Sequence, residues 1–237
     1  MEWVDEVVRR VQPSASLPDL SWRTLLIVGA LALVLVTVRP LWRVVRLGVT
    51  LVHELGHAFT GILCGRRFTG FVLRPDMSGH AVTAGRPRGA GLALTTWAGY
   101  PAPAVVALGA VVAVGQGLAA PVVTVALLAL VVALPRIRSV LTAAVVVAVA
   151  AGLGGLWWWR DDTLQAGVLL GAALVLLVGA WRHILTVAGV RDLRSDPAVL
   201  TALTRVPRLV WVATYLAVAA GATYGAAWSL RLVPGPG

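Results

Sequence analysis

The chain has 237 residues, of which 59% are hydrophobic and 13% are charged. A soluble domain is about 45–50% apolar and about 25% charged, so this composition excludes an ordinary soluble fold and indicates an all-α integral membrane protein. The net charge of +10 comes from arginine alone, because the chain contains no lysine. Arginines scattered over several loops without a recognition motif are typical of topology signals, so we expect a lipid bilayer and no nucleic acid as partner. Lysine-free usage is also typical of a GC-rich bacterial genome.

Residues 1–21 are interpreted as an amphipathic N-terminal segment. They begin acidic and lack the short apolar region and cleavage site of a signal peptide. Apolar residues recur among charged ones over residues 2–12, which predicts a short helix lying on the membrane surface. These apolar residues are Trp3, Val4, Val7, Val8 and Val11.

Residues 22–232 are expected to form a single polytopic membrane domain. Apolar runs of about 20 residues predict six to seven transmembrane helices in a multi-pass protein of the cell membrane. The runs lie at 22–38, 43–64, 90–115, 118–134, 139–159, 164–188 and 208–230. Residues 66–88 instead carry five arginines and alternate in polarity, which predicts a short β-hairpin or re-entrant loop. The tail at 233–237 is expected to be flexible.

The loop arginines also predict an orientation. Loops that retain many arginines usually face the cytoplasm. On this basis the N-terminus and the loops at 66–88, 135–138 and 189–207 are expected on one side of the membrane.

The stretch "LVHELGHAFT", Leu51–Thr60, places three ionisable side chains inside an apolar run. Residues four apart share one face of a helix, so His53 and His57 can present two imidazoles to one metal ion. Glu54 is adjacent and can reach a water in the open coordination position. This H-E-x-x-H pattern predicts a zinc ion held by His53 and His57, with Glu54 as general base.

Two observations bear on how specific this pattern is. Ionisable groups inside a membrane span usually serve a function, and Glu54 is the only acidic residue well inside a predicted span. The plainer interpretation is a polar cluster that joins neighbouring helices. Gly56 lets another backbone approach this helix face, which suits either interpretation.

At this point the sequence resembles the site-2 protease family of intramembrane zinc metallopeptidases, in particular its small bacterial branch. The resemblance lies in "HELGHAFTGILCGRRFTGFVL", where the motif helix runs into a hairpin, and in "WAGYPAPAVVAL" of the next span. It implies a zinc metalloprotease that cuts a membrane-anchored protein, such as an anti-sigma factor. Prolines near Gly99 distort the helix, so freed backbone groups at Gly99, Tyr100 and Pro101 are expected to bind an extended substrate or a neighbouring helix.

The third metal ligand is not settled by the sequence. The family completes its site with an aspartate from an L-D-G-type motif in a later span, and this chain has no such motif. His183 is an unusual intramembrane histidine that can complete a three-histidine site, or it snorkels beside Arg182. Asp196 is the alternative ligand, but the proline that follows it favours a helix cap. Asp192 is expected to be solvated.

Three functions therefore stay open. The first is an intramembrane zinc metalloendopeptidase that uses Glu54 as general base. The second is a non-catalytic relative that binds metal or only a partner, which the missing L-D-G motif favours. The third is a transporter, which usually spreads polar groups along several spans rather than concentrating them in one.

Overall fold

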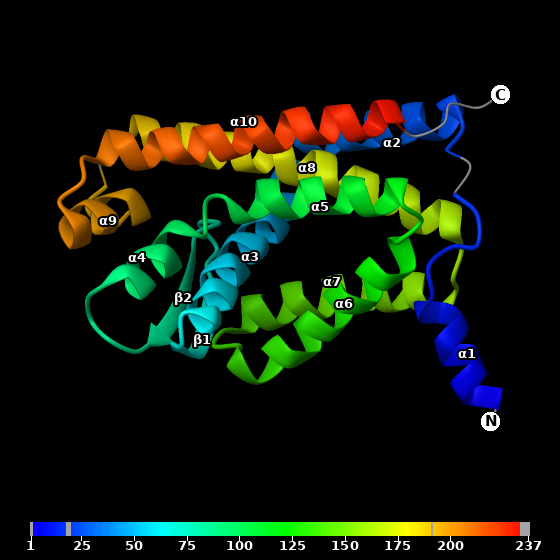
Figure 1. Cartoon of the computed structure of the whole chain (residues 1–237), viewed down its shortest axis with the longest axis horizontal. Helices are drawn as coiled ribbons and strands as arrows, with labels where there is room; N and C mark the ends of the chain where they lie inside the picture. The colour runs from blue at the N-terminus through cyan, green and yellow to red at the C-terminus, as the bar shows by residue number, and fades with distance from the viewer. Residues whose placement is uncertain (1, 18–19, 191, 233–237) are drawn as a thin grey trace.

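Helices dominate the computed structural model, which describes residues 2–17, 20–190 and 192–232. The expected tail at 233–237 lies outside these residues. Figure 1 shows a bundle of helices with a small hairpin at one end. In chain order the elements are α1 (Glu2–Val11), α2 (Trp22–Thr37), α3 (Arg39–Leu63), β1 (Arg67–Leu73), β2 (Gly79–Ala84), α4 (Ala90–Trp97), α5 (Ala102–Gly115), α6 (Ala119–Ala133), a 3-10 turn (Leu134–Arg136), α7 (Val140–Trp158), α8 (Asp162–Gly189), α9 (Asp196–Thr204) and α10 (Arg208–Leu232).

Four of the helical segments described are long and apolar enough to cross a membrane alone, namely α6 with its 3-10 turn, α7, α8 and α10. Two further pairs meet the same criteria together but are bent, α2 with α3 by 99° and α4 with α5 by 67°. Counting each bent pair as one span gives up to six spans. This confirms the all-α membrane fold at the lower end of the predicted number, because the prediction had counted α2 and α3 separately.

Prolines explain where the two bent pairs break. Pro40 lies in the first turn of α3, after Val38, whose extended backbone ends α2. Pro103 lies in the first turn of α5, and Pro101 stands just before that helix. Proline lacks an amide hydrogen and is therefore tolerated in a first turn but not in a helix interior. The predicted distortion near Gly99 is confirmed.

The two ends of the helical bundle carry different elements. In Figure 1 the hairpin, α4 and α9 lie at one end of the long axis, and α1 and the last turns of α10 lie at the other. The backbone amide of Ser14 donates to the carbonyl of Gly117, which ties the N-terminal segment to the α5–α6 loop at this second end. The expectation that the N-terminus shares a side with the 66–88 and 189–207 loops is therefore wrong. The reason is that α2 and α3 form one bent pair instead of two successive spans.

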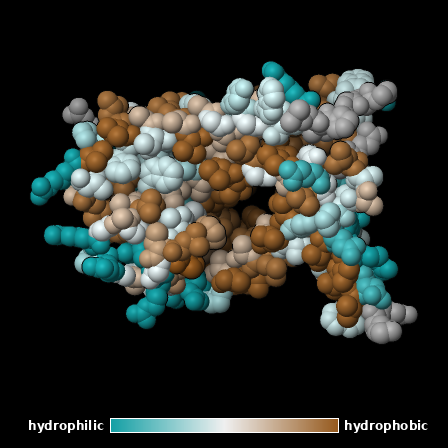
Figure 2. All heavy atoms as spheres, in the orientation of Figure 1, coloured by the Kyte–Doolittle hydropathy of each residue, from teal (hydrophilic) through white to brown (hydrophobic). Residues whose placement is uncertain are grey.

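The main core lies where α5, α8 and α10 pack together. It consists largely of small residues, including Ala104, Ala107, Ala166, Ala173 and Ala219, all fully buried. Small residues let helix backbones approach closely in lipid, where van der Waals packing replaces the hydrophobic drive. Figure 2 shows apolar side chains on the outside of the molecule, as expected for a surface that contacts lipid.

The predicted hairpin is confirmed as an antiparallel pair, β1 with β2. Phe71 of β1 forms a parallel bridge with Ile137, so the outer edge of β1 is covered. The Leu73 amide donates to the buried Thr142 hydroxyl at 2.7 Å, which anchors β1 to the start of α7. β2 pairs only with β1 within the described part of the chain, so its other edge is available for a further strand.

Candidate metal centre

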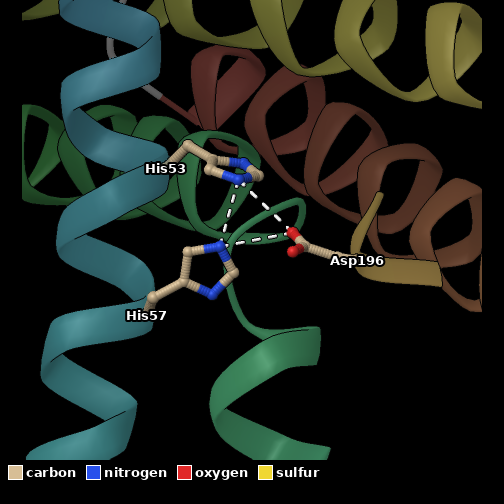
Figure 3. Close-up of side chains that lie close together, drawn as sticks. All are labelled: His53, His57 and Asp196. Atoms are coloured by element: carbon tan, nitrogen blue, oxygen red, sulfur yellow. Dashed lines mark hydrogen bonds and ion pairs between the residues drawn. The ribbon is translucent and has the colours of Figure 1, made fainter. Parts of the chain in front are cut away.

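Helix α3 brings His53 and His57 to one point, as the spacing predicts. Their Nε2 atoms lie 3.1 Å apart. A carboxylate oxygen of Asp196, Oδ2, lies 3.4 Å from His53 Nε2 and 3.2 Å from His57 Nε2. Figure 3 shows both imidazoles pointing at this carboxylate, which comes from the start of α9. His53, His57 and Asp196 together can hold a metal ion.

The distances suit one zinc ion between the three residues. Tetrahedral ligands about 2.0–2.1 Å from a zinc ion lie about 3.3–3.4 Å from one another, close to the three separations observed. His57 Nδ1 donates to the backbone carbonyl of Thr95 at 2.7 Å, which leaves Nε2 free to bind metal. Metal-bound histidines almost always have their second nitrogen oriented in this way.

Asp196 reaches the histidines because α9 packs against α4 and α10 at the hairpin end of the bundle. The expectation that Asp196 caps this helix is not met: Ser195 occupies the cap position, and Asp196 is the first helical residue. Burial would raise the pKa of the Asp196 carboxyl, but the two imidazoles hold that pKa well below its usual value. The carboxylate is therefore ionised and available as a ligand.

His183 lies close to this cluster but outside it. Its ring centroid is 6.4 Å from that of His53, and the residue lines the same cavity. It is not one of the three residues whose ligand atoms converge. Asp192 is exposed, and its carboxylate accepts a hydrogen bond from the Arg194 amide at 2.8 Å, which fits the expected solvated turn.

The break between α4 and α5 passes directly behind the histidines. A Cβ atom at Gly99 would overlap His57 Nε2 and would lie 2.8 Å from His53 Cε1. A Cβ atom at Gly56 would overlap that of Ala102, so α3 and the break are packed backbone to backbone, as expected for Gly56. The break is therefore held against the metal site by glycines on both sides.

Tyr100 joins the site to the bundle. Its ring meets that of His53 edge-on at 4.9 Å and stacks on that of Tyr215 at 4.9 Å. Tyr215 is fully buried in α10, and the sequence had not singled it out, because a tyrosine in an apolar span carries no signal of its partner.

Glu54 is almost fully buried and also lines the cavity. Its Oε2 atom has no hydrogen-bond partner in the part of the chain that the structure describes. A Cβ atom at Gly79 would overlap Glu54 Oε1, so the start of β2 lies directly against this carboxylate. The Glu54 carboxylate therefore packs against the face of the hairpin at the first residue of β2.

A cavity of about 350 Å³ opens beside the cluster. It extends from the motif helix to the end of α8 and the start of α9, and the β1–β2 turn forms one wall. Its lining residues are Arg46, Thr50, His53, Glu54, Met77, Ser78, Gly79, Tyr100, His183, Thr186, Val187, Val190, Asp192, Arg194, Ser195 and Asp196.

A candidate two-histidine, one-carboxylate centre on an H-E-x-x-H helix, inside a helical membrane bundle, is the arrangement of a membrane metallopeptidase of the site-2 protease type. A family model described as Peptidase M50B-like matches residues 26–226, which is most of the chain. The chain therefore belongs to the Peptidase M50B-like family, and the predicted resemblance is confirmed. Neither the curated proteins nor the solved structures gave a match.

Proposed function

We propose that this protein is an intramembrane zinc metalloendopeptidase of the cell membrane that hydrolyses a peptide bond of a membrane-anchored protein. In this proposal His53, His57 and Asp196 are the zinc ligands and Glu54 is the general base. The observation that carries it is the convergence of the three ligand atoms, all within 4.8 Å of one another, beside Glu54 in a member of a peptidase family.

The chemistry follows from the groups around the cavity. Zinc, when bound, makes a water molecule more acidic and polarises the scissile carbonyl. Glu54 takes a proton from the attacking water in this proposal, which is supported by its unpartnered Oε2, on a carboxylate that lines the cavity. The same carboxyl then gives that proton to the leaving amide nitrogen. His57 is kept in position through these steps by its hydrogen bond to the Thr95 carbonyl.

The substrate is proposed to bind as an extended strand. A helix buries its peptide bonds in its own hydrogen bonds, whereas a strand exposes them to attack. Gly79, the first residue of β2, lies against Glu54, and β2 has a free edge within the described part of the chain, which supports binding of the substrate as an added strand close to the proposed base. Backbone groups freed at the Gly99–Pro101 break are proposed to hold the other side of the substrate, with Tyr100 facing the cavity.

The amphipathic segment at residues 1–21 is proposed to lie on the membrane surface, separate from a single membrane domain at residues 22–232. Exposure of Trp3, Val4 and Val8 on one short helix supports this proposal, because such side chains favour the interface of a bilayer.

The test is metal content and cleavage in the detergent-purified protein, measured for matched variants. We expect about one zinc ion per chain. Zinc should be lost or weakened in His57→Ala and Asp196→Asn, and it should be retained in Glu54→Gln and His183→Gln.

Cleavage is followed on a panel of single-span membrane proteins in the same membranes. Glu54→Gln should lower it by about 10²–10⁴-fold, the usual contribution of a general base. A wild-type protein without metal, even after zinc is supplied, would favour the non-catalytic relative. Equal cleavage by wild type and Glu54→Gln would refute the assigned base.

A further inference from the structure

Two buried nitrogen atoms on the cavity have no role in the chemistry above. They are Nε of Arg46, on α3, and Nε2 of His183, on α8, and both residues line the cavity. Neither atom has a hydrogen-bond partner among residues 2–17, 20–190 and 192–232. Leaving a buried polar atom unpaired costs stability, so each of these two nitrogen atoms calls for a partner, and a ligand in the cavity can supply it.

The charges around the cavity indicate what kind of ligand this is. Arg46 belongs to none of the ion pairs formed within the described part of the chain. The acidic residues on the cavity are already committed: Asp196 to the two imidazoles, Glu54 to the proposed proton transfer, and Asp192 to its own turn. A guanidinium without a counter-charge at a cavity wall favours an anionic group of the ligand.

The position of Arg46 sets the distance of that group from the reacting bond. Arg46 lies seven residues before His53 on α3, which corresponds to about 10 Å along the helix axis. An extended peptide advances about 3.3 Å per residue, so the same distance spans about three residues of substrate.

The hairpin lies along this path. The hydroxyl of Thr50, one turn beyond Arg46, donates to the Met77 carbonyl at 3.0 Å. Met77, Ser78 and Gly79 are consecutive and all line the cavity. The turn before β2 and its first residue therefore lie along the part of α3 that separates Arg46 from Glu54.

We propose that Arg46 and His183 form a subsite that binds a carboxylate of the substrate about three residues from the scissile bond. This inference rests on the proposed peptidase function. Arginine binds a carboxylate with two parallel hydrogen bonds, and His183 adds a third donor in the tautomer whose Nε2 carries the proton. The carboxylate is either an acidic side chain or the C-terminus of a short peptide, since both present the same two oxygens.

The test uses short peptides anchored at the metal by a hydroxamate group. One series extends from the hydroxamate towards the N-terminus and a second towards the C-terminus, because the direction of the bound chain is not assumed. Each series carries Glu or Gln at the second, third or fourth residue. Matched peptides that end at the third residue as a free acid or an amide test the C-terminal source.

In the wild-type protein with zinc, the Glu or free-acid peptide should bind about 10- to 100-fold more tightly than its neutral match, the usual effect of a hydrogen-bonded ion pair. Arg46→Met should abolish this preference, and His183→Gln should reduce it. Arg43→Met is the control, because Arg43 is exposed one turn earlier on the same helix. Equal binding of charged and neutral peptides at every position would overturn the subsite.

A melting measurement separates failure of the subsite from failure of the peptidase function. If no hydroxamate peptide binds even with zinc, the proposed function fails. The subsite is then tested by the melting temperature of Arg46→Met. A guanidinium without an ion-pair partner in the described part of the chain predicts that this variant melts at the same temperature as wild type or higher. A melting temperature several degrees lower would show a structural role and overturn the subsite. If Arg46→Met lowers the melting temperature only in nanodiscs that contain anionic lipid, Arg46 binds a lipid headgroup. This result would also overturn the subsite.

Discussion

Gly99→Ala is the sharpest test of how the metal site is assembled. The substitution adds one methyl group outside the H-E-x-x-H motif and removes no ligand. Gly99 is not among the glycines with a left-handed backbone, so alanine can adopt its conformation without strain. Any effect must come from the space that the new Cβ atom occupies.

That space is already filled by the two histidines. The Cβ atom would overlap His57 Nε2 and lie 2.8 Å from His53 Cε1, whereas ordinary contact begins at 3.4 Å. His53 must therefore move by about 0.6 Å, and His57 by more, if the backbone holds its place. Metal–ligand distances tolerate about 0.2 Å. We expect the zinc affinity of Gly99→Ala to fall by about 10- to 100-fold or more, the range seen when ligand orientation is lost.

The assay is competition for zinc between the purified protein and a chromogenic chelator, with melting of the metal-free protein as a check on folding. Gly48→Ala is the control, because Gly48 lies on α3 with the two histidines and a Cβ atom there meets nothing within 4 Å. Wild-type zinc affinity in a folded Gly99→Ala protein would refute the reasoning, since the histidines would then not be packed against the break as described.

Two further predictions concern the hairpin. Gly79→Ala places a methyl group on the Glu54 carboxylate, so cleavage should fall on the order of 10²-fold while zinc content is unchanged; Gly85→Ala, which meets only the Arg66 side chain, is the control, and full activity of Gly79→Ala would contradict the prediction. Thr142→Val leaves the Leu73 amide without its buried acceptor, so thermal unfolding in detergent should show a loss of about 1–3 kcal/mol. Thr124→Val is its control, since that hydroxyl bonds only within α6, and equal losses in the two variants would refute the anchoring role of Thr142.

The half of the site that lies on α3 could be predicted from the sequence because it is local. Helix geometry alone brings residues 53 and 57 together, and the structure places their Nε2 atoms 3.1 Å apart. The hairpin after this helix and the break near Gly99 were predicted for similar reasons, from alternation and from proline. Each of these features depends only on neighbours in the chain.

Asp196 could not be predicted as a ligand from local sequence patterns. It lies far from the motif in sequence, and only the packing of α9 on α4 and α10 brings it to the histidines. Viewed locally, an acidic residue before a proline is a helix cap, and that interpretation missed Ser195 as the cap. His183 was singled out because an intramembrane histidine is unusual, but that signal cannot distinguish a metal ligand from a residue that binds substrate nearby.

The site also depends on segments outside α3, and two glycines show where these segments approach that helix. Three separate segments approach α3: β2 at Gly79, the α4–α5 break at Gly99, and α9 at Asp196. At Gly79 and Gly99 the important feature is the absence of a side chain. The sequence alone does not show this, because it does not show which atoms a Cβ atom would meet there. The three contacts serve different parts of the proposed chemistry, since Gly79 meets the base whereas Gly99 and Asp196 meet the ligands. Variants at these positions should therefore separate proton transfer from metal binding, and Arg46 should separate substrate binding from both.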